Sequence, residues 1–258
     1  IFELFPLNFE EFLIFKEENV KKYRTLKKKK IINEMEYEIY DKYYEEFIEW
    51  GGFPEVVLTE RIESKKDLLE DIFSSYYQNE ILKLADYRKN KKMRDLILLL
   101  AARVGSQLDI VKLSQELQLN RITVYSYLSF LQATYFIHLV SPFSKSIDRE
   151  VSGTKKVYFC DTGILKTIAT VNDGQVFKNA VYNQLKDKAE INYFRKKSGA
   201  EIDFIANKKI AYEVKQTATK SSVNKLKRIA EGMKLKEEFV VSKKYVKNLD
   251  NMVFGQFL

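Results

Sequence analysis

The chain has 258 residues, of which 45% are hydrophobic and 31% are charged, enough for two or three compact units. The single cysteine, Cys160, excludes an intramolecular disulfide and a zinc site built from cysteines, and the lone histidine, His138, lies in an apolar run, which argues against a Ser-His-Asp triad. The formal net charge of +8 suits an acidic partner such as nucleic acid, although a solubilising lysine-rich and glutamate-rich surface gives the same balance. No run of about 18 apolar residues occurs, so no membrane span is expected.

The sequence pattern of the first 60 residues predicts short helices. A strand-like IFELF precedes Pro6, and Asn8 with Glu11 forms a capping box for a helix. Residues 21–33 are rich in lysine and read as a flexible linker or, alternatively, as a phosphate-contacting patch. Residues 34–58 predict a helix that stops at two glycines followed by Pro54.

The middle of the chain predicts a long helix and then a winged helix. Apolar residues recur at helical spacing through residues 63–86. Helices are expected at 93–104, 111–117 and 121–132, with a tight turn before the last, and strands at 135–140 and 156–160. A short helix, a tight turn and a second helix with a polar face are typical of helix-turn-helix units.

This unit supplies the candidate contacts to nucleic acid. The second helix presents polar side chains, and residues 141–156 are expected to form a mobile basic wing that includes Lys156. The candidates are Arg121, Thr123, Tyr125, Lys145, Arg149 and Lys155. The alternative is that the unit only packs between domains.

Three strands are expected in close succession, at 191–194, 201–206 and 210–215, with residues 207–209 as a hairpin loop. That loop would place Asp203 opposite Glu213 and Glu201 opposite Lys215, all on one face. Opposed carboxylates destabilise a sheet unless a cation lies between them. Asp203, Glu213 and the carbonyl of Val214 are therefore candidate ligands of Mg²⁺, with Lys215 beside them to stabilise developing charge. A solvated hairpin with a Glu201–Lys215 pair is the plainer alternative.

The flanking segments predict a mixed sheet covered by helices. Residues 175–187 carry an apolar helical stripe, and Ser222 is expected to cap a helix over 223–233. A strand at 239–241 and an apolar edge within 246–258 complete an α/β layer arrangement.

Asp203, followed by Glu213-Val214-Lys215 on the next strand, resembles the core of PD-(D/E)XK nucleases, in which Gln216 also matches a position that some members use. The stretches IFELFPLNFEEFL, KVYFCDTGIL and YFRKKSGAEIDFIANKKIAYEVK are similar to the C-terminal region of a family of archaeal and bacterial AAA-type ATPases. The resemblance implies a multidomain α/β protein. Residues 1–60 would be a helical lid remnant, 61–160 a helical and winged-helix domain, and 161–258 a restriction-endonuclease-like mixed-sheet domain. The catalytic set it implies is Asp203, Glu213, Lys215 and Gln216.

The same family carries a glutamate on the helix before the nuclease strands, where this chain has Lys178. A lysine there opposes metal binding, so Mg²⁺ affinity and cleavage are expected to be weak, although Glu190 or Glu201 is a candidate substitute. Three readings follow: a DNA-binding module with a degraded metal site, an active Mg²⁺-dependent DNA nuclease, or a protein-interaction module.

The remaining expectations concern the context of the chain. No P-loop occurs, so no ATPase activity is expected from this chain itself. The sequence opens without methionine inside an apolar run, so we expect a fragment whose partners are DNA and a missing N-terminal ATPase domain, with an oligomer as a further option. No signal peptide is visible, and a cytoplasmic location is expected.

Overall fold

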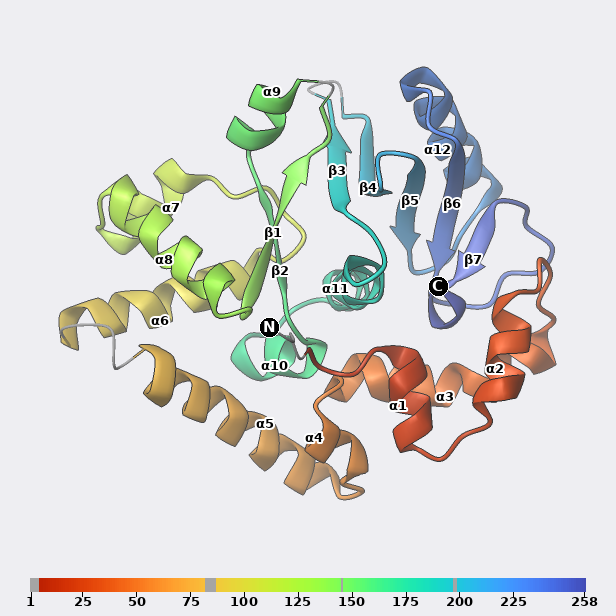
Figure 1. Cartoon of the computed structure of the whole chain (residues 1–258), viewed down its shortest axis with the longest axis horizontal. Coiled ribbons are helices and arrows are strands. Elements are labelled where there is room, and N and C mark those ends of the chain that lie inside the picture. The colour runs from red at the N-terminus through yellow and green to blue at the C-terminus, as the bar shows by residue number, and fades with distance from the viewer. Residues whose placement is uncertain (1–4, 82–86, 145, 197–198) are drawn as a thin grey trace.

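The computed structural model describes residues 5–81, 87–144, 146–196 and 199–258. It shows a mixed α/β fold with one seven-stranded mixed sheet (Figure 1). The expected strand within IFELF and the end of the expected helix 63–86 fall largely outside the described residues.

Helices α1 to α8 precede the first strand, and helices and strands are mixed in the second half of the chain. The helices are α1 (Phe9–Phe15), α2 (Val20–Lys27), α3 (Glu34–Trp50), α4 (Pro54–Leu58), α5 (Ile62–Tyr76), α6 (Tyr87–Ala102), α7 (Ile110–Leu117), α8 (Arg121–Ala133), α9 (Ile147–Ser152), α10 (Thr162–Ile168), α11 (Asp173–Lys186) and α12 (Lys220–Met233). The strands are β1 (Ile137–Pro142), β2 (Lys156–Phe159), β3 (Ile191–Arg195), β4 (Glu201–Ala206), β5 (Ile210–Lys215), β6 (Glu237–Ser242) and β7 (Met252–Phe254). A π-helical turn, Tyr77–Ile81, continues α5, and a 3₁₀ turn, Gly255–Phe257, follows β7.

The sheet has the order β2-β1-β3-β4-β5-β6-β7. Its pairs β2–β1, β3–β4 and β4–β5 are antiparallel, while β1–β3, β5–β6 and β6–β7 are parallel. The hairpin β1–β2, expected to belong to the winged helix, thus joins the sheet of the expected nuclease-like unit through Ser141–Asn192 and Pro142–Tyr193. Helices α5 to α8 lie on the outer side of this hairpin, and β3 to β7 lie on its other side (Figure 1).

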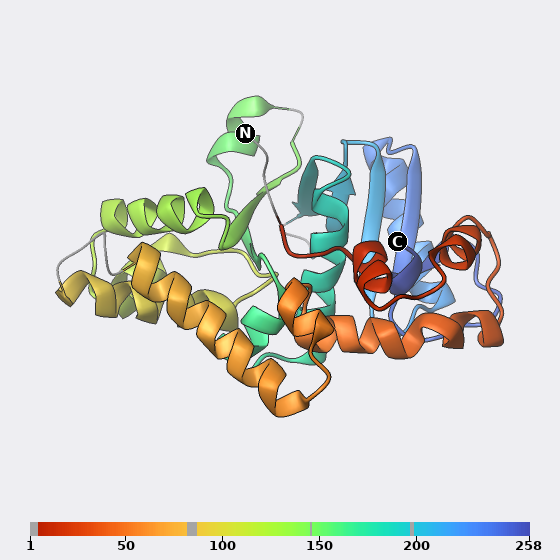
Figure 2. The same cartoon turned by 60° about the horizontal axis from the view of Figure 1, so that its bottom comes forward.

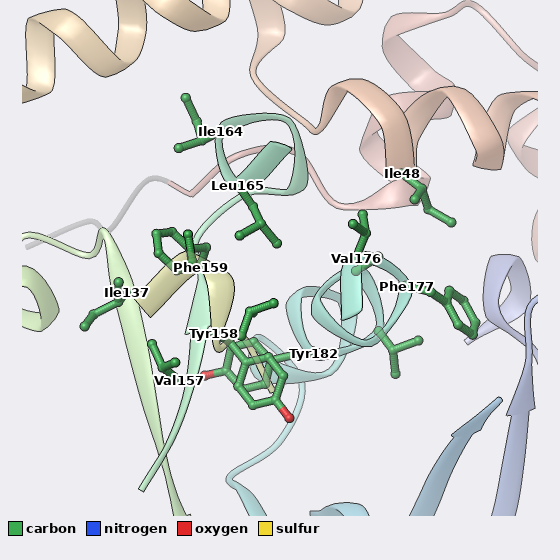
Figure 3. Packing of buried hydrophobic residues seen from close by; sticks show 14 of the residues in the cluster. Ile48, Ile137, Val157, Tyr158, Phe159, Ile164, Leu165, Val176, Phe177 and Tyr182 are labelled. Atoms are coloured by element: carbon green, nitrogen blue, oxygen red, sulfur yellow. The ribbon is translucent and has the colours of Figure 1, made fainter. Parts of the chain in front are cut away.

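Two apolar clusters hold the layers together. The larger extends from Phe9 to Phe257 and packs α11 between the hairpin and the N-terminal helices. Figure 3 shows its centre, where Tyr158 of β2 stacks on Tyr182 of α11 with the ring centroids 4.5 Å apart. The smaller cluster packs α12 against β4 to β6, through side chains such as Leu226 and Ile205.

Most local predictions from residue patterns are confirmed. The capping box of Asn8 and Glu11 starts α1, and Gly51 (φ 78°) ends α3 in a backbone conformation that favours glycine. Pro54 does not simply stop a helix, because it occupies the first turn of α4. The helices and strands expected around residues 93–140 are present with ends shifted by up to six residues, and β4 and β5 have the expected bounds.

Three local predictions are wrong. Residues 20–27 form α2 rather than a flexible linker, because Tyr23 and Leu26 lie three positions apart and are both buried. The expected mobile wing contains α9. Helix α12 is capped by Thr219, and Ser222 is the third helical residue of its capping box.

Candidate functional site

The hairpin β4–β5 positions the acidic residues of the candidate site. Its regular pairs are Ala206–Ile210, Ile205–Ala211 and Phe204–Tyr212, the register expected from the loop over 207–209. Asn207 and Lys208 both have positive φ angles, 48° and 58°, the conformation that a tight hairpin turn needs.

The pairing of β4 with β3 is irregular at Asp203 and Phe204. Asn192 pairs with Ile205 and Phe194 with Ile202, so two steps along β3 match three along β4. This is a bulge, which re-aims side chains locally. Beyond Phe204–Tyr212, the Asp203 carboxylate accepts a hydrogen bond from the main-chain N–H of Val214 at 2.9 Å. The Asp203 side chain thus joins β4 to β5 beyond the last regular pair, where a simple strand pair of Asp203 with Glu213 was expected.

Lys178 of α11 contacts the same carboxylate. Its Nζ lies 2.6 Å from Asp203 Oδ1, and Asp203 is 3% exposed. Helix α11 directs Lys178 toward the sheet, since Phe177 and Val181 at neighbouring helical positions are buried in the core. The chain approaches closely here: a Cβ at Gly105 would lie 3.2 Å from the Lys178 side chain.

Glu213 is the second buried carboxylate of the site. Its Oε1 accepts a hydrogen bond from Lys215 Nζ at 2.7 Å. Burial, and then the nearby charge of Asp203, raise the pKa of Glu213, while Lys215 and Lys178 oppose that shift. Burial lowers the pKa of Lys215, but its contact with Glu213 prevails and raises it. Asp203, Glu213, Lys178 and Lys215 therefore form one electrostatic group, which we call the acid–lysine cluster.

The other charged residues near this cluster have partners of their own. Glu201 does not pair with Lys215, because its Oε1 lies 2.5 Å from Nζ of Lys156. Lys156 was expected on a basic wing, yet it is 1% exposed and its Nζ lies 4.8 Å from the centroid of the Tyr193 ring. Glu190 is exposed beside the β4–β5 loop, where its N–H donates to Asn207 Oδ1.

A divalent cation does not fit the acid–lysine cluster. Both oxygens of Asp203 accept hydrogen bonds, from Lys178 and from Val214. Two ammonium groups already balance the two carboxylates, and a Mg²⁺ ion between them would lie next to a positive charge. Among the described residues, no group of three or more His, Cys, Asp or Glu side chains is arranged to hold a metal.

Buried polar atoms without partners lie in and beside the cluster. Within the described part of the chain, Glu213 Oε2, Tyr158 Oη and Gln216 Nε2 make no hydrogen bond. The carbonyl of Gln216 accepts from the N–H of Lys244, which ties the end of β5 to the residues after β6. Burial, and then the charge of Asp203, raise the pKa of Tyr158. The sequence did not predict that Tyr158 lies near this carboxylate, since nothing in KVYFC distinguishes a core tyrosine from one near a charged group.

The candidate nucleic-acid contacts lie mostly on α8 and α9. Arg121 and Arg149 are exposed, Tyr125 is 57% exposed, and Thr123 is half-buried. Asn120 caps α8 by accepting from the Thr123 N–H at 2.7 Å, as expected. Lys155 is not free for phosphate, because its Nζ donates to Ser141 Oγ and to the carbonyl of Glu150. Lys145 lies outside the described residues.

Family models match most of the chain. Residues 41–175 match a domain of unknown function (DUF8612) and residues 173–253 match a second one (DUF4143). The first match covers just over half of the chain, so the chain belongs to the DUF8612 family. DUF4143 is a domain found in AAA-ATPase-associated proteins.

Two curated relatives are uncharacterized proteins. One, from Methanocaldococcus jannaschii, is named MJ1544 and is 26% identical over 249 residues, covering 90% of this chain and 54% of the relative. The other, from Haemophilus influenzae, is 26% identical over 214 residues, covering 80% of this chain and 50% of the relative. The chain therefore spans about half the length of these relatives. No solved structure matches the chain. None of the helices within the described residues is long and apolar enough to cross a bilayer.

Proposed function

We propose that this chain is the C-terminal region of an AAA-type ATPase, acting in the cytoplasm as a DNA-binding module. In this proposal α6 to α8 with the β1–β2 hairpin form a winged helix, and β3 to β6 with α11 and α12 form a PD-(D/E)XK-like unit. The match of residues 173–253 to a domain of ATPase-associated proteins supports the ATPase context. The partners would be DNA and the ATPase domain of the same protein.

The ion pair between Lys178 and Asp203 carries the non-catalytic part of the proposal. A metal-dependent nuclease needs an acidic set that attracts a cation, and here an ammonium lies 2.6 Å from the central carboxylate. The acid–lysine cluster thus retains a nuclease-like arrangement of Asp203, Glu213 and Lys215 with its negative charge already neutralised. Weak or absent Mg²⁺ binding and little cleavage are expected.

The exposed side of α8 supports the DNA-binding part. Arg121 and Tyr125 are exposed on this helix, and Arg149 is exposed on α9. A helix that follows a tight turn and keeps a free polar face is the element that enters the major groove in helix-turn-helix proteins. The net charge of +8 favours association with a polyanion.

The metal part is tested with Lys178→Glu beside the parent chain and the double variant Lys178→Glu/Asp203→Asn. Mn²⁺ binding is measured by titration calorimetry, and cleavage of linear and branched DNA is measured with Mg²⁺ or Mn²⁺. We expect no measurable binding by the parent, binding by Lys178→Glu, and its loss in the double variant. Rapid cleavage by the parent would instead support the alternative, an active nuclease, which the unpartnered Oε2 of Glu213 favours.

The DNA part is tested by fluorescence anisotropy with a labelled duplex. Arg121→Ala/Arg149→Ala should weaken binding about 3–30-fold and make the slope of log K against log salt shallower by about 1–2. The slope changes because each phosphate contact releases counterions, and the variant makes fewer such contacts. Lys225→Ala/Arg228→Ala, which removes two exposed charges from α12, is the matched control and should bind like the parent. Equal affinity for both double variants would contradict a DNA role for α8 and α9.

A further inference from the structure

An open groove runs beside the end of the sheet, on the far side of the molecule from α8 (Figure 1). It has a volume of about 1070 Å³ and lies between the segment after α2, the outer side of α12, and β7 with the loop before it. Just over half of its lining residues are apolar. They include Ile31, Ile32, Phe239, Val246, Leu249 and Val253.

Strand β7 ends the sheet, since it pairs with β6 and is last in the strand order. Val240 of β6 lies opposite Met252, and the Val240 N–H donates to the carbonyl of Asn251 at 2.9 Å. In a parallel pair a residue bonds to the two neighbours of the residue opposite it, so Asn251 and Val253 turn their main-chain groups toward β6. The N–H and carbonyl of Met252 therefore point away from β6, at the outer edge of the sheet.

The charge of the groove is strongly positive. Lys27, Lys29, Lys30 and Lys227 line it, against a single acidic residue, Asp250. Lys29 is bound to Glu36 and Lys27 to the carbonyl of Leu258. Lys30 and Lys227 are exposed and form no ion pair with any described residue. Ile31 beside them is 70% exposed, so its apolar side chain is accessible to a ligand in the groove.

We propose that this groove binds an extended peptide in which acidic residues alternate with aliphatic ones, paired as an added strand along β7. An added strand would satisfy the outward main-chain groups of Met252. Alternate side chains of a strand point to opposite sides, so one row would enter the apolar lining while the other meets the lysines. A peptide suits the groove better than a nucleic acid, because the aromatic rings of the lining are not available for base stacking: Phe254 and Phe257 are buried, and Phe239 is half-buried and stacks on Tyr212.

The probe is a fluorescent peptide of about ten residues in which aspartate or glutamate alternates with valine or isoleucine. Binding to the full chain is measured by anisotropy, with a lysine–valine peptide and a single-stranded oligothymidine as comparisons. Lys30→Glu/Lys227→Glu reverses the two unpaired charges of the groove. Lys28→Glu/Lys225→Glu is the matched control, since these lysines are exposed on the same two segments and do not line the groove.

We expect the acidic peptide to bind, the groove variant to lose at least tenfold in affinity, and the control variant to change by less than threefold. Amide hydrogen exchange gives a second readout, because the added strand should slow exchange of the Met252 N–H when peptide is present. Equal loss in both double variants, unchanged exchange at Met252, or binding of the oligothymidine in place of the peptide would each overturn the proposal. Neither result bears on the proposed DNA-binding function, since that function depends on residues of α8, α9 and the acid–lysine cluster.

Discussion

At the scale of single residues, the two lysines of the acid–lysine cluster balance the negative charge of two buried carboxylates. Asp203 and Glu213 are 3% and 9% exposed, and an unbalanced pair of buried negative charges is costly. Lys178 and Lys215 each supply an ammonium at hydrogen-bond distance. The four side chains therefore balance their charges within the chain.

Removing the ammonium of Lys178 should therefore destabilise the fold in a pH-dependent way. We expect Lys178→Met to lower the free energy of unfolding by about 1–3 kcal/mol at pH 7.5, since Asp203 loses a hydrogen-bonded partner. The loss should shrink toward pH 5, because the raised pKa of Glu213 lets that carboxyl take up a proton earlier and remove one negative charge. Urea unfolding at both pH values measures this. In a double-mutant cycle, Lys178→Met/Asp203→Asn should recover part of the loss, and strict additivity would contradict direct coupling.

His138, the single histidine, should make stability depend on pH in the range of a histidine titration. Burial, and then the charge of Lys186, lower its pKa to about 4, while Asp187 acts in the opposite direction. The unfolded chain, with a pKa near 6.5, then binds more protons than the folded chain between about pH 4 and 6.5. Stability due to neutral His138 is complete above about pH 6.5 and is lost as pH falls toward 4.

Replacing His138 by leucine should remove that loss. The ring packs between Phe5 and Tyr182, so an apolar side chain suits the site. We expect the parent to lose about 2–3 kcal/mol between pH 7 and 4.5 relative to His138→Leu, measured by urea unfolding at each pH. Parallel pH profiles for the two chains would show that His138 is not buried in this way.

At the scale of elements, the junction between α3 and α10 depends on a buried carboxylate. Asp161 accepts from the N–H groups of Gly52 at 2.7 Å and Ile164 at 3.0 Å, and so joins the end of α3 to the start of α10. Burial raises the pKa of Asp161 to about 6, against these hydrogen bonds. The elements meet closely here, since a Cβ at Gly163 would lie 2.3 Å from the Trp50 carbonyl oxygen.

Two substitutions test this junction. Asp161→Ala should cost about 2–4 kcal/mol, because it leaves several buried N–H groups without acceptors. Gly163→Ala should be destabilising as well, through the clash with the α3 main chain, and Gly232→Ala is its control because nothing lies within 4 Å of the added Cβ. Thermal unfolding measures all three. A Gly163→Ala variant as stable as Gly232→Ala would contradict the close packing of α3 on α10.

Local patterns predicted elements well where the signal is local. The three-residue loop, the capping box at Asn8 and the glycine end of α3 depend on residues a few positions apart. The wrong predictions for α2 and for Lys156 share one cause, which is partners distant in sequence. Helix α2 was predicted to be a linker because the residue that its buried Tyr23 packs against, Phe257, lies at the other end of the chain. Lys156 was assigned to a basic wing because its ion-pair partner, Glu201, lies 45 residues away in the sequence. Lys178 was placed beside Asp203 by resemblance to a family, since no spacing within the chain reveals a helix-to-strand contact.

At the scale of the whole molecule, the N-terminal helices and the C-terminal strands share one core. The hydroxyl of Tyr23 donates to the Gln256 carbonyl at 2.9 Å, and that of Tyr37 donates to the Lys243 carbonyl at 2.6 Å. Gln184 of α11 contacts Tyr44 of α3 in the same region. Figure 2 shows α3, in orange, lying across one end of the sheet strands and of α11. The segments expected as separate units therefore contribute to a continuous apolar cluster.

A continuous core predicts one cooperative unfolding transition for this chain, since separate domains would each unfold at their own denaturant concentration. Trp50, the single tryptophan, lies at the α3–α10 junction and reports on the core by fluorescence. Far-ultraviolet circular dichroism reports mainly on the helices, including α5 to α8 outside the β1–β2 hairpin. We expect the two urea curves to coincide in midpoint and slope. Asp161→Ala should shift both midpoints together, because loosening the junction weakens the whole core. An early dichroism transition that leaves Trp50 fluorescence unchanged would show instead that α5 to α8 unfold on their own, as an independent winged-helix domain would.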